Sequence, residues 1–160
     1  MSMVDSIVDG GGFFEAATLG KCKLACDNKY QPRPVAMDMV RMHQPETQPC
    51  AVRRLVQEVA KQVKVTVKFY TAVGSVLDEF HSIDAFFMFG EIDVTIDVTR
   101  NARKCSGRAD VIIQADDFED IAKLAALIVG EYQAKSRNVC HSRRHSERGA
   151  PRREYVWRAA

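Results

Sequence analysis

Two apolar segments separated by only two residues constrain the fold of this chain most strongly. Residues 82–89 and 92–99 both have strand-like composition, and only Gly90-Glu91 lies between them. A two-residue loop with glycine first is typical of a type II′ hairpin turn, which fixes the strand register. One face of the predicted hairpin is then entirely apolar and packs on a core. Its cross-strand pairs are Phe89–Ile92, Phe87–Val94, Ala85–Ile96 and Ile83–Val98.

The surrounding sequence supplies further strands and two amphipathic helices. Alternation of apolar and polar residues predicts a strand at 64–73, and a β-rich run predicts another at 109–114. Apolar residues at helical spacing predict helices at 51–62 and 118–135. The chain is therefore expected to be an α/β (α+β) protein, with a central mixed four-stranded sheet, a β-hairpin and two flanking helices.

The chain has 160 residues, 46% of them apolar, which suits one compact domain with extensions. Glycines 10–12 and four prolines between 32 and 49 predict an irregular N-terminal arm over 1–50, with room for a short helix in 13–25. Residues 51–136 form the predicted core domain. Residues 137–160, rich in Arg, Ser and His, lack periodicity and are expected to be extended unless bound.

The sequence excludes several classes of protein. No apolar stretch approaches the roughly 18–20 residues that a membrane span needs, and the first residues lack the basic-then-apolar pattern of an export signal. An odd count of five cysteines without a compact framework favours a reducing compartment. We therefore expect a cytoplasmic protein without a membrane partner.

Charge is divided unevenly along the chain. Residues 135–160 contain eight Lys or Arg and two acids, a net charge of +6, so the first 134 residues carry −4 of the overall +2. An acidic body with a basic tail favours contact with a polyanion, usually nucleic acid. A solubilising extension is the alternative.

Asp84 and Asp97 are the main candidates for chemistry. In the predicted register they are cross-strand neighbours, and like charges at such positions repel. A divalent cation, Mg²⁺ or Mn²⁺, would offset this repulsion, because carboxylates and substrate phosphates are its usual ligands. Phe86 and Met88 on the same face indicate partial cover, whereas an open, hydrated face would need no metal.

A basic group follows these acids. Such cations stabilise the charge that develops on phosphoryl oxygens while a metal polarises the phosphate and activates water. Lys104 is the preferred catalytic member, and a solvated loop is the alternative. The candidate nucleic-acid-binding residues are Arg100, Arg103, Arg108, Arg143, Arg144, Arg152 and Arg153.

The segments Ser82-Ile83-Asp84-Ala85-Phe86-Phe87 and Val94-Thr95-Ile96-Asp97-Val98-Thr99 resemble the core of the PD-(D/E)XK nuclease-like superfamily. That resemblance covers about residues 51–115 and implies metal-dependent hydrolysis of nucleic acid phosphodiesters. It implies Asp84 as the first acid, Asp97 as the second and Glu58 as the acid on the preceding helix. A surface ion pair with Arg54 or Lys61 is the other interpretation of Glu58.

Thr99 occupies the position where that superfamily has lysine, so Lys104 or a neighbouring arginine would have to supply the cation. The first hypothesis is a Mg²⁺-dependent nuclease or a nuclease-like nucleic-acid-binding protein, with DNA favoured over RNA as the partner. The second is a non-catalytic assembly protein, such as a virion component, that docks on protein partners through residues 1–50 and 137–160.

A zinc site is a weaker hypothesis. Cys22 and Cys26 lie four residues apart, as do His141 and His145, and thiolates and imidazoles are zinc ligands. Nothing in the sequence shows that the two pairs meet, so free thiols are the alternative.

Overall fold

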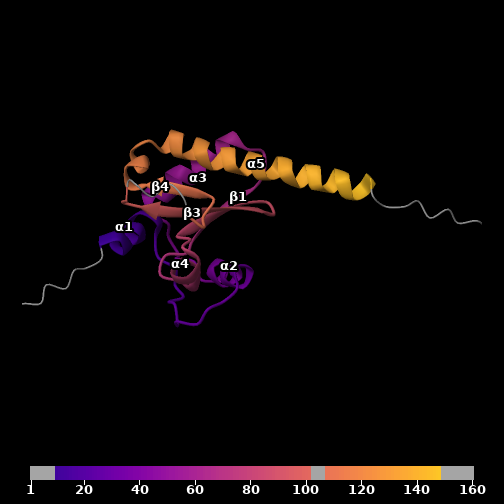
Figure 1. The fold of residues 1–160 in the computed structure, drawn as a ribbon. Helices are drawn as coiled ribbons and strands as arrows, with labels where there is room; N and C mark the ends of the chain where they lie inside the picture. The colour runs from indigo at the N-terminus through magenta and orange to yellow at the C-terminus, as the bar shows by residue number, and fades with distance from the viewer. Residues whose placement is uncertain (1–9, 102–106, 149–160) are drawn as a thin grey trace, which may run out of the picture.

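The protein is a mixed α/β structure in which a four-stranded sheet lies between two layers of helices (Figure 1). The computed structural model describes residues 10–101 and 107–148, with side chains described over 14–101 and 107–143. This confirms the fold class expected from the sequence. The helices are α1 (Gly10–Leu19), α2 (Arg33–Met42), α3 (Cys50–Gln62), α4 (Val76–His81) and α5 (Ile121–Arg148), with a short 3₁₀ helix η1 (Ala115–Glu119).

The sheet has its strands in chain order. They are β1 (Val67–Thr71), β2 (Ala85–Phe89), β3 (Ile92–Thr99) and β4 (Val111–Gln114). The first three are antiparallel neighbours, whereas β4 pairs parallel to β3. The strand ends that carry Thr99 and Gln114 therefore meet at one edge of the sheet.

The hairpin between β2 and β3 has the predicted register. Phe89 pairs with Ile92, and the pairing continues to Ala85 opposite Ile96. Gly90 has φ +62°, and Glu91 is not among the described residues with positive φ, as a type II′ turn requires. The two-residue turn therefore set the register, because a slip of one residue would move every side chain to the other face.

Counted from the turn, the predicted register holds as far as Ala85 and fails at Asp84. The amide of Asp84 donates to the carbonyl of Ile96 over 2.8 Å, so the pairing has slipped by one residue and β2 begins at Ala85 rather than Ser82. Ser82 adopts a left-handed conformation with φ +54°. Ile83 consequently packs among residues of α2 and α4 instead of opposite Val98, which corrects the prediction for this pair.

Helices α3 and α5 cover one face of the sheet, as predicted for the two amphipathic segments. Val52, Leu55 and Val59 of α3 are buried there, together with Leu124 and Ile128 of α5. Pro49 precedes the first turn of α3, and its carbonyl accepts from the amide of Arg53. This face holds the apolar side of the hairpin and forms the larger core.

Helices α2 and α4 cover the other face (Figure 1). Ala36 and Val40 of α2 and Leu77 of α4 are buried against Phe86. Neither helix was predicted: α2 lies in the segment expected to be irregular, and α4 lies between the strands predicted at 64–73 and 82–89. These helices lie on the polar face of the hairpin, where Asp84, Phe86 and Asp97 are buried.

The N-terminal and C-terminal segments are more helical than expected. Helix α1 begins within the three glycines and brings Leu19 into the larger core. Helix α5 continues to Arg148, well past the predicted end near 135, and its last turns project away from the sheet (Figure 1). None of the described helices combines the length and apolar character needed to cross a bilayer.

Candidate metal centre

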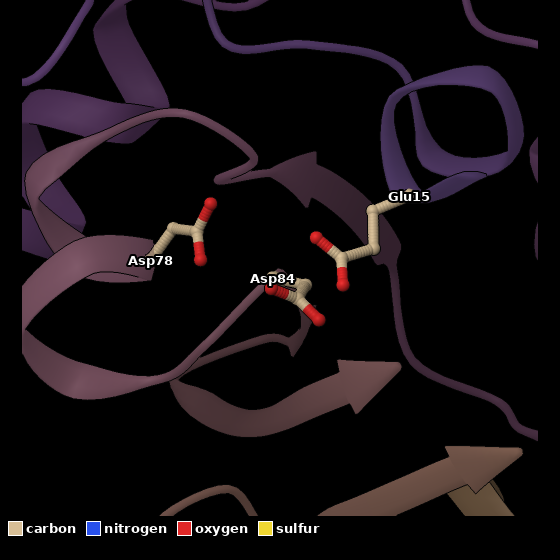
Figure 2. A group of neighbouring side chains, drawn as sticks. All are labelled: Glu15, Asp78 and Asp84. Carbon is tan, nitrogen blue, oxygen red and sulfur yellow. The ribbon is translucent and has the colours of Figure 1, made fainter. Parts of the chain in front are cut away.

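Three carboxylates from separate parts of the chain converge beside the start of β2. They belong to Glu15 of α1, Asp78 of α4 and Asp84, and one oxygen of each lies within 4.8 Å of the others. Figure 2 shows Glu15 and Asp78 pointing toward Asp84 from opposite sides. This group could hold a metal ion.

Local hydrogen bonds fix the position of Asp78. The amide of Gly74 donates to Asp78 Oδ2 over 2.8 Å, and Ser75 caps α4 by accepting from the amide of Leu77. Gly74 has φ +81°, a conformation that glycine adopts without strain. The sharp turn after β1 therefore directs the first turn of α4 toward Asp84.

Asp84 is held rigidly and is nearly excluded from solvent. Asp84 is 3% exposed, and its Oδ2 accepts a hydrogen bond from the amide of Val98 over 2.7 Å. Burial raises the pKa of Asp84 to about 8, opposed by this hydrogen bond and reinforced by the charges of Glu15, Asp78 and Asp97. Without a cation, Asp84 therefore carries a proton at neutral pH.

The pKa of Asp78 is also raised, chiefly by burial. Hydrogen bonds from Gly74 and with the Asp84 side chain lower it, while the charges of Glu79 and Asp97 raise it. Burial and the neighbouring charges therefore favour a proton on this pair of carboxyls. A divalent cation would displace that proton.

The donor set fits a hard divalent cation. Mg²⁺ and Ca²⁺ prefer carboxylate oxygens, and oxygens bound on opposite sides of one Mg²⁺ are about 4 Å apart. Only one pair among three ligands can take opposite positions, and oxygens at adjacent positions are about 3 Å apart. The oxygens of Glu15, Asp78 and Asp84, which lie within 4.8 Å of one another, would therefore approach by up to about 2 Å to share such an ion. The bound cation would offset the mutual repulsion of the three carboxylates.

Asp97 lies next to this group and is 5% exposed. It is not one of the three residues whose oxygens meet, but its charge acts on both Asp78 and Asp84. The register slip at Asp84 explains the difference from a direct cross-strand pair. Both acids are buried, so the alternative of an open, hydrated sheet face is wrong.

Glu58 lies apart from the three converging acids. It forms an ion pair with Lys61 over 2.7 Å on α3 and lines a depression with Arg54 and Asp120. The contacts of Glu58 therefore agree with its interpretation as a surface acid that pairs with Lys61. The acids that helices do bring to Asp84 are Glu15 of α1 and Asp78 of α4.

The predicted basic residues are dispersed. Arg100, at the end of β3, places its guanidinium over the ring of Phe14, and Arg108 donates to the carbonyl of Phe80. Arg143 is exposed on α5. Arg103, Lys104, Arg152, Arg153 and the side chain of Arg144 lie outside the described residues.

The cysteines and histidines do not assemble within the described part of the chain. Cys22 is buried and donates to the carbonyl of His43, whereas His141 is exposed on α5. The group of Glu15, Asp78 and Asp84 is the only cluster of three or more metal-ligating residues among the described side chains. The side chain of His145 lies outside them.

Sequence reasoning missed Glu15 and Asp78. Glu15 is the single charged residue in the ten-residue segment of α1, and an isolated acid among apolar residues is a signal of a buried role. Asp78 precedes Asp84 by six residues and lies between the strands predicted at 64–73 and 82–89.

Comparison with known proteins gave no match with any family model, curated protein or solved structure.

Proposed function

We propose that this protein hydrolyses phosphodiester bonds of nucleic acid with a Mg²⁺ or Mn²⁺ ion held by Glu15, Asp78 and Asp84. The observation that carries the proposal is the convergence of three carboxylates at a buried aspartate whose pKa is about 8. Perturbed carboxylates of this kind are typical of functional sites. The combination of Asp84, Asp97 and a helix acid also agrees with the nuclease-like resemblance, with Glu15 in the place proposed for Glu58.

A bound divalent cation would polarise the phosphate and lower the pKa of a coordinated water. The residues of the chain would prepare that chemistry. Glu15, Asp78 and Asp84 would orient the ion, and Asp97 would add negative charge that favours its binding. Arg100 and Arg108 are the described cations of the segment that follows β3, and Lys104 remains the predicted transition-state cation.

The projecting helix α5 supports nucleic acid as the partner. Arg137 and Arg143 are exposed on it, and its sequence carries Arg144 and Arg148 beyond them. A row of cations extending from the body would follow a phosphate backbone and release counterions. DNA is our preferred partner.

Cleavage assays test the proposal directly. Single- and double-stranded DNA and RNA are incubated with Mg²⁺ or Mn²⁺, using the native protein, Glu15→Gln and Asp84→Asn. We expect metal-dependent cleavage that falls at least about 100-fold in both variants. Glu58→Gln is the matched control and should retain activity. Absence of cleavage in every substrate would remove the enzyme proposal.

The second candidate function is a non-catalytic assembly component, for example of a virion. The projection of α5 from the body and the threonine at position 99 favour this function (Figure 1). It predicts salt-dependent nucleic-acid binding without cleavage in any metal.

A further inference from the structure

A cavity of about 760 Å³ opens between α1, the end of β3 and η1. Its volume lies in the range of small-molecule sites. The apolar part of its lining includes Phe14 and Phe118, and the charged part consists of Arg100, Asp116 and Glu119. None of these residues belongs to the candidate metal centre.

The guanidinium of Arg100 lies over an aromatic ring at this cavity. Its guanidinium carbon lies 4.8 Å from the centroid of Phe14, whose ring packs edge-on to Phe118 with centroids 6.5 Å apart. A guanidinium is planar and has two faces. Because Arg100 is exposed and lines the cavity, its guanidinium can stack on a flat ligand there.

The charges in the cavity argue against a phosphate as its ligand. Asp116 and Glu119 give it two carboxylates against the single cation Arg100. A neutral ring avoids that repulsion. Carboxylates accept hydrogen bonds from exocyclic amino groups such as the N4 amino group of cytosine. The lining therefore suits a nucleobase that carries an amino group.

Two residues that line the cavity are close in sequence to acids at the candidate metal centre. Phe14 precedes Glu15 in α1, and Arg100 follows Asp97 by three residues, a distance of about 10 Å along a strand. A base in the cavity would thus lie close to a phosphate held at the three acids.

We infer that this cavity binds one unpaired nucleobase bearing an exocyclic amino group, stacked on Arg100. Where it concerns the substrate, this inference rests on the proposed function: the nuclease would act on single-stranded or frayed nucleic acid. Bases within an intact duplex are stacked on one another and cannot enter a pocket of this kind without leaving the helix.

Binding assays in EDTA, where no cleavage occurs, test the base site. We expect single-stranded oligo-dC to bind more tightly than oligo-dT of equal length, because thymine lacks an exocyclic amino group. Arg100→Lys retains the charge but loses the planar stacking surface, so oligo-dC affinity should fall about 5- to 100-fold while duplex affinity is unchanged. Arg53→Lys, an exposed arginine on α3, is the matched control.

Each outcome distinguishes the base site from the nuclease proposal. Equal losses for oligo-dC and duplex in Arg100→Lys would assign Arg100 to phosphate contact and overturn the inference. Unchanged oligo-dC binding in Arg100→Lys would also overturn it, even if metal-dependent cleavage is found. A specific loss of oligo-dC binding without any detectable cleavage would support the base site and remove the nuclease. Asp116→Ala combined with Glu119→Ala removes both acceptors and should abolish the preference for oligo-dC, and a preference that persists in this double variant would overturn the assignment of the two carboxylates to the amino group.

Discussion

The backbone amide of Val98 donates to the carboxylate of Asp84 over 2.7 Å, across the point where the pairing of β2 and β3 slips by one residue. A regular ladder would use a carbonyl as this acceptor. Here the side chain of Asp84 replaces it, so the carboxylate is anchored to the sheet while Glu15 and Asp78 approach from elsewhere. The slip therefore fixes Asp84, one member of the candidate metal centre, at the end of the hairpin away from the turn.

Metal binding should depend strongly on pH. Because the pKa of Asp84 is raised from about 3.9 in an unfolded chain to about 8, the folded protein holds a proton that the unfolded chain has lost between these values. The stability of the metal-free protein should therefore fall as pH rises through this window. Added Mn²⁺ should raise the melting temperature more above pH 8 than at pH 6, as measured by thermal denaturation at each pH. An equal shift at both pH values would contradict a protonated Asp84.

Asp84→Asn should stabilise the metal-free protein at pH 8. Asparagine can still accept from the amide of Val98 but carries no charge, so repulsion from Glu15 and Asp78 disappears. We expect a gain of roughly 1–3 kcal/mol in the free energy of unfolding, measured with urea, together with loss of the Mn²⁺-induced shift. Asp116→Asn, at an exposed residue of η1, provides the control. Destabilisation of Asp84→Asn would show that the carboxylate is ionised and satisfied.

The ion pair between Lys135 and Asp110 should be a major stabilising contact. Lys135 Nζ lies 2.5 Å from Asp110 Oδ2 and also donates to the carbonyl of Asp93, which connects α5 to the sheet. Burial would raise the pKa of Asp110, but the hydrogen bonds and charge of Lys135 and the hydrogen bonds from Thr95 lower it. Asp110→Asn should cost about 1–3 kcal/mol at pH 7, measured by urea denaturation.

The pH dependence of the Asp110 contribution has the opposite sign to that of Asp84. Since the pKa of Asp110 is lowered on folding, its contribution is present above the unfolded value of about 3.9 and is lost as pH falls through the lower folded value. The difference in stability between the native protein and Asp110→Asn should therefore shrink in acid. A difference that is constant from pH 7 to the acid transition would exclude this ion pair as the cause.

Gly90→Ala should weaken the hairpin through backbone strain alone. Gly90 has φ +62°, and a Cβ placed there meets nothing within 4 Å, so no clash adds to the cost. We expect a loss of about 1 kcal/mol in the free energy of unfolding. Gly90→Asn should cost less, because asparagine tolerates this conformation better. Equal stability of Gly90→Ala and the native protein would contradict the turn geometry.

Charge removal on α5 should weaken nucleic-acid binding without regard to sequence. Arg137→Ala combined with Arg143→Ala removes two exposed cations, so the slope of log affinity against log salt should become shallower by about 2. Affinity titrations at several salt concentrations measure this slope. Lys64→Ala, an exposed residue between α3 and β1, should leave it nearly unchanged. An unaltered slope in the double variant would exclude α5 as the phosphate-binding element.

Local patterns determined the hairpin and the two helices on its apolar face. The register from Phe89–Ile92 to Ala85–Ile96 follows from the length of the turn at Gly90, and α3 follows from the spacing of Val52, Leu55 and Val59. Such features depend on neighbours within a few residues, so the sequence by itself could predict them. It also predicted that Asp84 and Asp97 lie on one partly covered face, and both are buried.

Only the tertiary structure decided which acids meet Asp84 and where helices α1, α2 and α4 form. Glu15 lies 69 positions before Asp84 and reaches it because α1 packs on the core through Leu19. Helices α2 and α4 cover the second face of the sheet although they have only ten and six residues. Isolated helices of such length are marginal in water, so burial against the rest of the protein decides whether these segments are helical.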